Sequence, residues 1–469
     1  MNKLLISGAI TVLLAGCSLA PVNERPAAPV PQAWPSGDAY RAAAQAPGVM
    51  AAADVAWRDF IEDERLRKLI AVALVHNRDL RVSVLNIDKA RAQYGVARAS
   101  QVPHLDATLG QNASRMPATM STTGESYTTR QYSAGLGIPS YELDFFGRLK
   151  NLSAVALEQY LGTEEDRRTQ QISLVAEVAN AWLTLAADQQ RLQLAKDTFK
   201  SQEASLDLTR RRFDAGATSG LDVQQARTSV ESARHDVAVY TAQVAADRNA
   251  LTLLAGAAVN PLLLPDGRLD PVTKLAELPE GVTSEVLQRR PDVLSAERTL
   301  RAANANIGAA RAAFFPNISL TASAGSASAA LSGLFKAGSG AWSFAPQLSL
   351  PIFAGGANRA NLALANVDRD IAVAHYEKAI QSAFREVADA LATRGTLEER
   401  LASQAALVDA SGKSYDIHRA RYERGTDTFL NALVSQRSLY SAQQGLIDAR
   451  LAKASNQVTL YKVLGGGWQ

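Results

Sequence analysis

The chain carries the same turn twice, and this repetition constrains the fold more than any other feature of the sequence. The first copy, Arg211 to Ala233, reads RRFDAGATSGLDVQQARTSVESA, and the second, Arg421 to Ala442, reads RYERGTDTFLNALVSQRSLYSA. The spacing from the turn glycine to a later glycine is the same in both copies, from Gly216 to Gly256 and from Gly425 to Gly465. A duplication this regular indicates two structurally equivalent halves.

Proline is absent from two long stretches, 151–260 and 352–469, which are rich in alanine, leucine, glutamine, arginine and glutamate. A proline inside a helix costs about 3 kcal/mol, so its absence favours long helices. Apolar residues recur every three or four positions, for example at Ile172, Val175, Ala179 and Trp182. We therefore predict helical hairpins, with helices over 154–213, 221–255 and 430–464, and shorter helices over 66–100 and 283–313.

Four short stretches have a different period. Residues 105–110, 132–138, 317–324 and 342–350 alternate apolar with small or polar side chains, which predicts strands with one apolar face. A water-soluble sandwich is one interpretation. Aromatic residues at both ends favour the other, a transmembrane barrel whose polar face lines a lumen. They are Tyr127, Tyr132, Trp342 and Phe344 near the outer loops, and Tyr141, Phe145, Phe146, Phe314, Phe315 and Phe353 near the helices.

Four strands cannot close a barrel, and an open sheet edge in lipid leaves backbone groups without hydrogen bonds. The chain must therefore oligomerise if it spans a membrane. Two copies would give about eight strands around a filled interior, whereas three would give about twelve strands around a channel. The small side chains of the polar face favour the trimer.

The N-terminus has the pattern of a secreted protein. Lys3 precedes the apolar run 4–15, and the sequence Leu-Ala-Gly-Cys ends at Cys17. This pattern resembles a bacterial lipobox, which predicts a lipoprotein signal peptide over 1–16 and an acylated tether over 17–53 that begins with lipid attachment at Cys17. The serine after Cys17 points to the outer membrane. An ordinary signal peptide with a chance cysteine, or a buried N-terminal helix, are the alternatives.

Several classes of protein are disfavoured by composition. The 49 basic and 46 acidic residues leave a net charge of +3, and no basic run indicates a nucleic-acid partner. A single cysteine excludes an intramolecular disulfide and a cysteine-based metal cluster. Gly412-Lys413-Ser414 lacks the earlier glycine and the preceding strand of a phosphate-binding loop. We expect no enzyme activity, no cofactor and no metal site.

Several long runs carry a resemblance that covers the whole chain. They are the lipobox, YELDFFGRL (141–149), LQRRPDVLSAE (287–297), AARAAFFPNISL (309–320) and the terminal Gly-Gly-Gly-Trp. Together they resemble the TolC-like outer-membrane factors, in the lipoprotein branch that serves tripartite multidrug efflux pumps of the RND type.

The resemblance implies an α+β membrane protein: a trimeric β-barrel of about 12 strands, four per chain, continuous with a long coiled-coil α-helical barrel. It also implies an equatorial belt from residues such as 54–65 and 257–290. The corresponding domains are a first structural repeat over 54–260 and a second over 261–469, with an equatorial segment over 261–290.

The function implied is that of an outer-membrane exit duct. It would passively conduct drugs and other small toxic molecules from a periplasmic adaptor and an inner-membrane RND-type transporter to the exterior. A duct for type I protein secretion or metal export, or a structural or adhesive stalk, are the alternatives. The predicted outer loops, 116–129 and 325–340, are short, which disfavours the stalk. Homotrimer formation and contact with outer-membrane lipid follow from the same resemblance.

The two repeated turns would form the periplasmic tip. Its exposed residues are the predicted docking surface for the adaptor: Asp214, Gly216, Gly220, Glu423 and Gly425. A passive duct has no energy source, so it must open by binding a partner that prefers the open state.

In this family a hydrophobic residue followed by two acids commonly rings the closed aperture, and the matching positions here are Leu430, Asn431 and Val434. Only the hydrophobic one fits the pattern. An acid survives as Asp222 in the first copy, and Asp427 lies nearby in the second. We therefore predict a ring that is more apolar and less acidic than usual. Leu430 and Val434 could equally be residues of a coiled-coil seam.

Overall fold

The computed structural model describes residues 18–40, 55–269 and 284–468. The predicted signal peptide, the lipid-attachment residue Cys17 and part of the equatorial segment 261–290 therefore lie outside the described residues. The chain forms two compact units. The strand unit comprises the described residues up to Ala27 with Asn86–Thr163 and Ser295–Tyr376, and the helical unit comprises Ala28–Leu85, Glu164–Leu294 and Glu377 onward.

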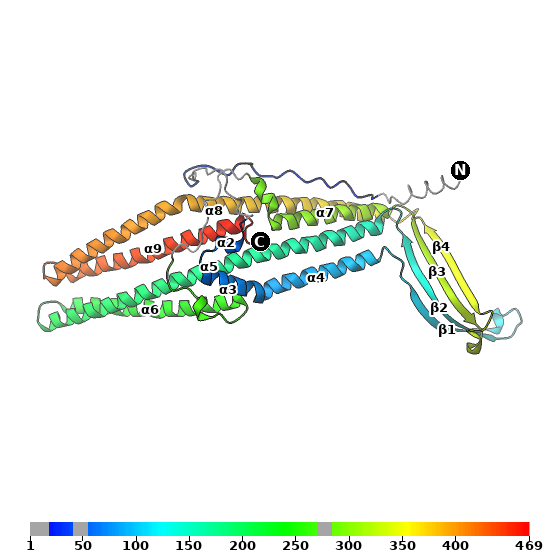
Figure 1. Ribbon diagram of the computed structural model, residues 1–469, viewed down its shortest axis with the longest axis horizontal. Coiled ribbons are helices and arrows are strands. Elements are labelled where there is room, and N and C mark those ends of the chain that lie inside the picture. Colours follow the sequence, from blue (N-terminus) through cyan, green and yellow to red (C-terminus); the bar gives the residue numbers. More distant parts are fainter. Residues whose placement is uncertain (1–17, 41–54, 270–283, 469) are drawn as a thin grey trace. The chain divides into compact units, whose positions relative to one another are not determined.

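The same order of elements occurs twice along the chain (Figure 1). The first half contains α4 (Arg78–Ala99), β1 (Asp106–Met116), β2 (Tyr127–Leu143), α5 (Arg148–Asp214) and α6 (Gly220–Ala255). The second half contains α7 (Pro291–Ala312), β3 (Asn317–Ser328), β4 (Gly340–Ser349), α8 (Ala357–Glu423) and α9 (Phe429–Val463). Helices α5 and α8 are each 67 residues long, and α4 and α7 are each 22 residues long. The repetition in the sequence is thus a repetition in the fold.

Short elements precede, interrupt and connect these halves. Two precede α4: α2 (Trp57–Phe60) and α3 (Glu64–His76). The 3-10 turns are η2 (Ala118–Met120), η3 (Pro261–Leu263), η4 (Ser284–Arg289) and η5 (Leu331–Gly333). The predicted helix over 283–313 is accordingly the turn η4 followed by α7, which begins at Pro291, a residue well suited to the first turn of a helix.

The predicted single helix over 66–100 is wrong, because the chain breaks at Asn77. The backbone of Asn77 is extended, with φ −60° and ψ 133°, and its side-chain oxygen accepts a hydrogen bond from the N–H of Leu80 at 2.9 Å. Its side-chain amide donates to the carbonyl of Leu254 at the end of α6, at 2.9 Å. Asn77 therefore caps α4 and ties it to α6, a tertiary role that a helical pattern does not reveal.

In the strand unit, β1 to β4 form one antiparallel sheet in sequence order. One row across the sheet is Ala107, Leu136, Ala324 and Trp342, and the adjacent row is Asp106, Gly137, Ser323 and Ser343. The predicted alternation of an apolar and a polar face is confirmed. Trp342 and Leu109 are 80% and 79% exposed, so the apolar face is bare of protein within the chain.

Residues 18–25 of the N-terminal tether make specific contacts in the strand unit that no sequence pattern predicts. The hydroxyl of Ser18 donates to Asn151 at 2.9 Å, and Arg311 donates to the carbonyl of Leu19 at 3.0 Å. Arg25 pairs with Glu297 at 2.6 Å. The start of the tether therefore lies against α5 and α7.

The helical unit has its core around α2 and α3. Leu66, Leu69 and Ile70 of α3 are fully buried, and they belong to one cluster with Trp182 of α5. The ring of Tyr461 in α9 stacks on Phe60 with centroids 3.8 Å apart. Its hydroxyl donates to the carbonyl of Val55 at 2.6 Å. This core fixes α5 and α9 to the segment that precedes α4.

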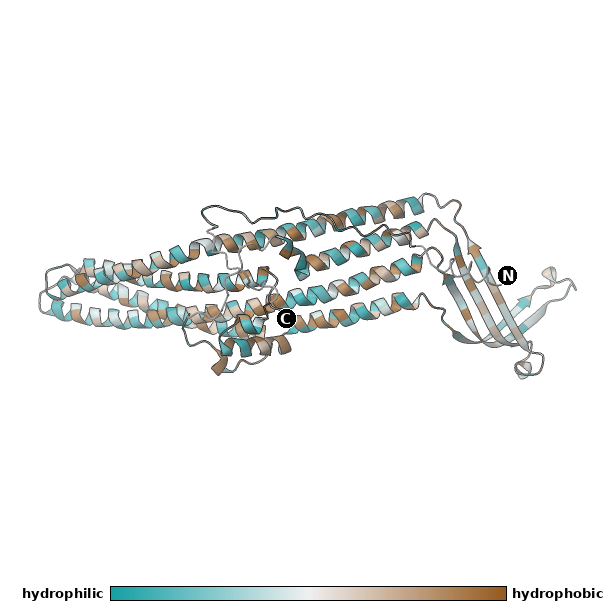
Figure 2. Cartoon of the chain, turned by 45° about the horizontal axis from the view of Figure 1, so that its top comes forward, coloured by the Kyte–Doolittle hydropathy of each residue, from teal (hydrophilic) through white to brown (hydrophobic). Residues whose placement is uncertain are grey.

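Hydrophilic residues interrupt the hydrophobic ones along all the long helices (Figure 2). Among the helices in the described part of the chain, none has both the length and the hydrophobicity that a membrane-spanning helix requires.

Gly256→Ala should destabilise the fold more than Gly425→Ala. Both glycines have positive φ, 66° and 76°, so alanine costs about 1–2 kcal/mol at either position. A Cβ at Gly256 would also lie 2.2 Å from the carbonyl oxygen of His76, whereas a Cβ at Gly425 would meet no atom within 4 Å. Overpacking adds about 1–3 kcal/mol. Thermal unfolding of the purified variants in detergent measures this difference, and equal losses of Tm would contradict it.

Candidate functional site: the two hairpin turns

Both repeated turns end their first helix in the same way. The N–H of Gly216 donates to the carbonyl of Phe213 at 2.9 Å, and the next N–H donates to the carbonyl of Arg212 at 2.7 Å. Gly425 and the residue after it make the equivalent bonds at 3.0 and 2.9 Å. This is the Schellman motif, which places a left-handed residue after the helix. The φ values, 73° and 76°, explain glycine at both positions.

The start of α6 is closed by a capping box. The hydroxyl of Ser219 accepts from the N–H of Asp222 at 3.2 Å, and the Asp222 carboxylate accepts from the N–H of Ser219 at 3.1 Å. The hydroxyl of Thr218 donates to the same carboxylate at 2.6 Å. Partial burial would raise the pKa of Asp222, but the hydrogen bonds from Thr218 and Ser219 hold this pKa below its usual value.

The start of α9 is closed differently. Thr428 is the N-cap and accepts from the N–H of Asn431 at 3.3 Å. The Asp427 carboxylate accepts from the N–H of Thr428 at 2.9 Å and from the side-chain amide of Asn431 at 2.7 Å. Its second oxygen lies 2.7 Å from Nδ1 of His418. The hydrogen bonds from Asn431, His418 and Thr428 lower the pKa of Asp427 to about 2.

With Gly216 and Gly425 aligned, Thr218 corresponds to Asp427, and Asp222 corresponds to Asn431. The carboxylate and the hydrogen-bond donor have therefore exchanged positions between the two turns. In the first turn Thr218 donates to Asp222, and in the second turn Asn431 donates to Asp427. Each turn therefore has one carboxylate within this pair of positions. Each carboxylate accepts a hydrogen bond from the N–H of the N-cap residue, and the prediction that the aperture ring is less acidic than usual stays a prediction.

Leu430 and Val434 lie outside the packing within the chain. Their exposed fractions are 50% and 53%, whereas Phe429 and Leu433 are buried in a cluster with Tyr422. The exposed face of α9 is therefore available either to an aperture or to packing against another chain.

All five predicted docking residues are exposed: Asp214, Gly216, Gly220, Glu423 and Gly425. Glu423 accepts a hydrogen bond from Arg419 one helical turn earlier, at 2.9 Å. These residues lie at or just after the ends of α5 and α8 and at the start of α6, where they face solvent.

Arg212 lies at the end of α5 and was not among the predicted site residues. Its guanidinium donates to the carbonyls of Tyr422 at 2.9 Å and Glu423 at 2.7 Å, and it lies 4.5 Å from the centre of the Tyr422 ring. These carbonyls belong to the last turn of α8, where a cation is favoured by the helix dipole. Arg212 therefore joins the end of the first hairpin to the second. Its partners are backbone atoms, so no side-chain pattern could have revealed them.

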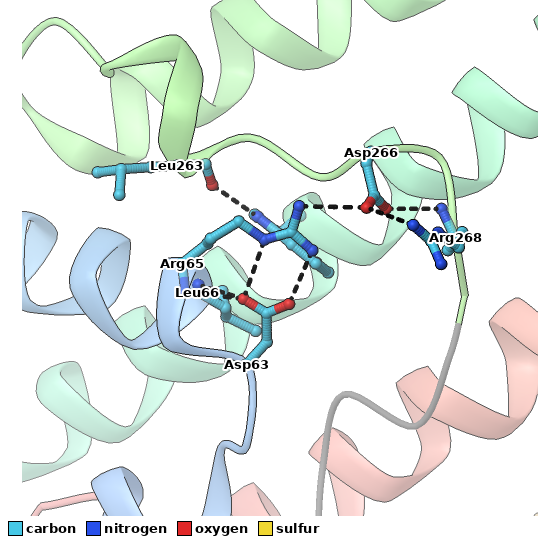
Figure 3. Close-up of polar contacts among 7 residues, drawn as sticks. Asp63, Arg65, Leu66, Leu263, Asp266 and Arg268 are labelled. Carbon is cyan, nitrogen blue, oxygen red and sulfur yellow. Dashed lines mark hydrogen bonds and ion pairs between the residues drawn. The ribbon is translucent and has the colours of Figure 1, made fainter.

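The described part of the predicted belt is anchored on α3 and α5 (Figure 3). Asp63 caps α3 by accepting from the N–H groups of Arg65 and Leu66 at 2.7 and 3.2 Å. Arg65 pairs with Asp63 at 3.0 Å and with Asp266 at 3.5 Å. The indole N–H of Trp182 donates to the carbonyl of Leu263 at 3.0 Å. These bonds hold the segment after α6 against the body of the helical unit.

No candidate metal site lies within the described residues. Within residues 18–40, 55–269 and 284–468, no group of three or more histidine, cysteine, aspartate or glutamate side chains could hold a metal ion.

The fold and the turns define the class of the protein. A sheet with a bare apolar face and a polar face of small residues, joined to long helical hairpins, is the architecture of an outer-membrane channel. Comparison with known proteins agrees. The profile of the family described as "Outer membrane efflux protein" matches residues 69–257 and 282–466. The chain belongs to this family.

Characterised relatives span nearly the whole chain. The toluene efflux pump outer membrane protein TtgC of Pseudomonas putida is 50% identical over 469 residues, which are 100% of this chain and 96% of the relative. The outer membrane protein OprJ of Pseudomonas aeruginosa is 46% identical over 460 residues, which are 98% of this chain and 95% of the relative. The open-state MtrE outer membrane channel of Neisseria gonorrhoeae superposes with a TM-score of 0.86 at 37% identity, covering 97% of this chain and 99% of MtrE.

These findings confirm the predicted fold class and resemblance. Solved structures of the family are trimeric channels with a helical barrel and four strands per chain. The protein is an outer-membrane exit duct of the efflux type, and it is not an enzyme.

Arg212→Ala should loosen the end of α8. Two charge-assisted hydrogen bonds of a partly exposed side chain are lost, together about 1.5–3 kcal/mol, so local amide exchange should accelerate about tenfold to a hundredfold. Arg211→Ala is the matched control, because Arg211 is exposed and pairs with Asp207 in its own helix. Hydrogen exchange of peptides covering 415–430 measures the effect. Equal protection in the two variants would show that Arg212 does not join the hairpins.

Proposed function

We propose that three copies of this chain form one outer-membrane duct that accepts solutes from a periplasmic adaptor and an inner-membrane RND-type transporter. The observation that supports the trimer is the open sheet. Strands β1 and β4 each pair on one side within the chain, and the apolar face beside them is exposed. In lipid, unpaired edges are excluded, so the edges pair between chains. Three copies give about twelve strands, enough to enclose a channel.

The proposed solutes are drugs and other small toxic molecules. The chain's relatives are named a toluene efflux protein and an antibiotic efflux protein, at 50% identity each. The polar face of the sheet offers Ser323, Ser343 and glycines, which leave space and make no strong binding site. These features support passive passage. Type I secretion and metal export remain the alternatives, because a duct does not select its cargo.

The proposed adaptor-docking surface consists of the exposed turn residues Asp214, Gly216, Gly220, Glu423 and Gly425. Their backbone is held in shape by the Schellman bonds and by the caps at Ser219 and Thr428. The proposed aperture residues are Leu430, Asn431, Val434, Asp222 and Asp427. Because the duct has no energy source, binding of the adaptor supplies the preference for an open state.

We also propose that Cys17 carries the lipid anchor. The sequence Leu-Ala-Gly-Cys, which ends at Cys17 after a short apolar run, supports this, because it is the pattern of a lipidated N-terminus.

Valine at both turn glycines, Gly216→Val with Gly425→Val, should abolish export without lowering the yield of trimer. A β-branched residue cannot adopt the positive φ, so the turns must rearrange, while the sheet and core are untouched. The control replaces both glycines with asparagine, which tolerates this conformation and meets no atom within 4 Å of its Cβ.

Export is measured as drug resistance of a host that lacks its own outer-membrane efflux protein but carries a matching adaptor and transporter. Trimer yield is measured on native gels of detergent extracts. Normal resistance with the valine variant would contradict the proposed role of the turns. A monomer from the wild-type chain would contradict the proposed trimer.

Cys17→Ser should remove the acyl groups from the mature chain while leaving its helices folded. Mass spectrometry of the protein extracted from membranes should detect acylated Cys17 in the wild type and a mass without acyl chains in the variant. An unmodified wild-type cysteine would contradict lipid attachment at this residue.

A further inference from the structure

Two aspartates meet inside the first hairpin, within the helical unit. The side chain of Asp188 in α5 is 6% exposed, and Asp247 in α6 is 9% exposed. One carboxylate oxygen of Asp247 accepts from the side-chain amide of Gln243 at 3.1 Å. The other oxygen, Oδ2, is buried without a hydrogen-bond donor among the described residues, and the carboxyl group lies against that of Asp188.

Arg191 is the cation that pairs with Asp188. Arg191 of α5 pairs with Asp188 and also with Asp448 of α9. The neighbouring groups are themselves paired: Tyr440 of α9 donates to Asp236 of α6 at 3.1 Å, and Gln444 donates to the hydroxyl of Tyr240 at 3.0 Å. Helix α3 reaches α6 about two turns further on, where Asn77 bonds to Leu254. Arg191 thus pairs with one of the two carboxylates that meet, and among the described residues no ion pair is formed by Asp247.

Two carboxylates in contact can both be acceptors only at high cost, and a shared proton removes this cost by turning one of them into a donor. Burial, together with the Asp188 carboxylate beside it, raises the pKa of Asp247 to about 6. The pair titrates as a unit, so this proton belongs to both residues.

The second hairpin shows what the fold needs at this place. With the turn glycines Gly216 and Gly425 aligned, Asp188 corresponds to Leu397 and Asp247 corresponds to Asn456. Leu397 is 3% exposed, and Asn456, 8% exposed, donates to the carbonyl of Ala390 at 3.0 Å. An apolar residue and an amide therefore fill the same positions in the same architecture. The carboxyl pair is not a requirement of the fold.

We propose that Asp188 and Asp247 form a proton-binding site that locks α6 onto α5, and that this lock is present in the first hairpin and lacking in the second. When the proton leaves, two buried carboxylates share one arginine and repel each other across the helix interface. The first hairpin then loosens while the second keeps its packing.

Because proton binding and packing are thermodynamically linked, the pKa of Asp247 determines how the stability of the first hairpin changes with pH. The folded-state pKa of Asp247, about 6, exceeds its ordinary value of 3.8, so protonation favours the packed state. The stabilisation is complete below the ordinary value and is lost as the pH rises through about 6. The lock concerns packing within one chain, so it stands independently of the proposed partners and aperture.

Hydrogen exchange tests the lock in purified wild-type protein. Peptides from 238–251 of α6 are compared with peptides from 447–460 of α9, which experience the same intrinsic effect of pH. Between about pH 5 and about pH 8, α6 should lose protection relative to α9 by several-fold up to about tenfold. Asp247→Asn, whose amide can donate to Asp188, should abolish this difference and leave α6 protected at both pH values.

Two further variants exploit the duplication. Asp188→Leu with Asp247→Asn gives the first hairpin the residues of the second and should also remove the pH dependence. Leu397→Asp with Asn456→Asp should transfer it to α9. Infrared spectra at about pH 5 should contain a protonated-carboxyl band that Asp247→Asn removes. An unchanged band, or the same pH-dependent loss of protection in wild type and Asp247→Asn, would overturn the proposal.

Discussion

The open edges of the four-stranded sheet are the constraint on which the rest of the structure depends. Strands β1 and β4 each satisfy half of their backbone groups within the chain, and lipid offers no water to satisfy the others. In lipid, the edge strands therefore need strands of other copies of the chain to satisfy their backbone groups. Helix α8 also exposes the apolar side chains Leu364, Val367 and Ile371 in the single chain. The proposed trimer would give these side chains partners on a neighbouring chain.

Duplication repeats the backbone but not the chemistry. Both turns have a glycine at positive φ and one capping carboxylate, yet the acid is Asp222 in one and Asp427 in the other. Further along the hairpins, Asp188 and Asp247 correspond to Leu397 and Asn456. Because both hairpins fold with either set of side chains, the backbone determines where side chains meet but not whether they are charged. Charge can then differ between hairpins without a change in architecture.

The sequence predicted the elements that local rules determine. The helices α5, α6 and α9 follow from the proline-free stretches, and Gly216 and Gly425 mark the turns between the helices of each hairpin. The caps Ser219 and Thr428 were not among the predictions. The strands follow from period-two alternation. What could not be predicted depends on contacts distant in sequence. Asn77 breaks a helix because it bonds to Leu254, and Arg212 binds carbonyls of α8. The partner of each is fixed only after the hairpins have packed.

The tip combines strong local bonds with few bonds between hairpins. Each turn is held by its own Schellman bonds and caps, all within a few residues of the glycine. Near this end, the contacts between the hairpins include Arg212 with the last carbonyls of α8, the hydroxyl of Thr209 at 3.5 Å from that of Tyr422, and a small apolar cluster around Tyr422. Local bonds persist when helices separate, whereas such cross-links break first. The turns can therefore move as intact units, which is what a duct that opens at this end requires.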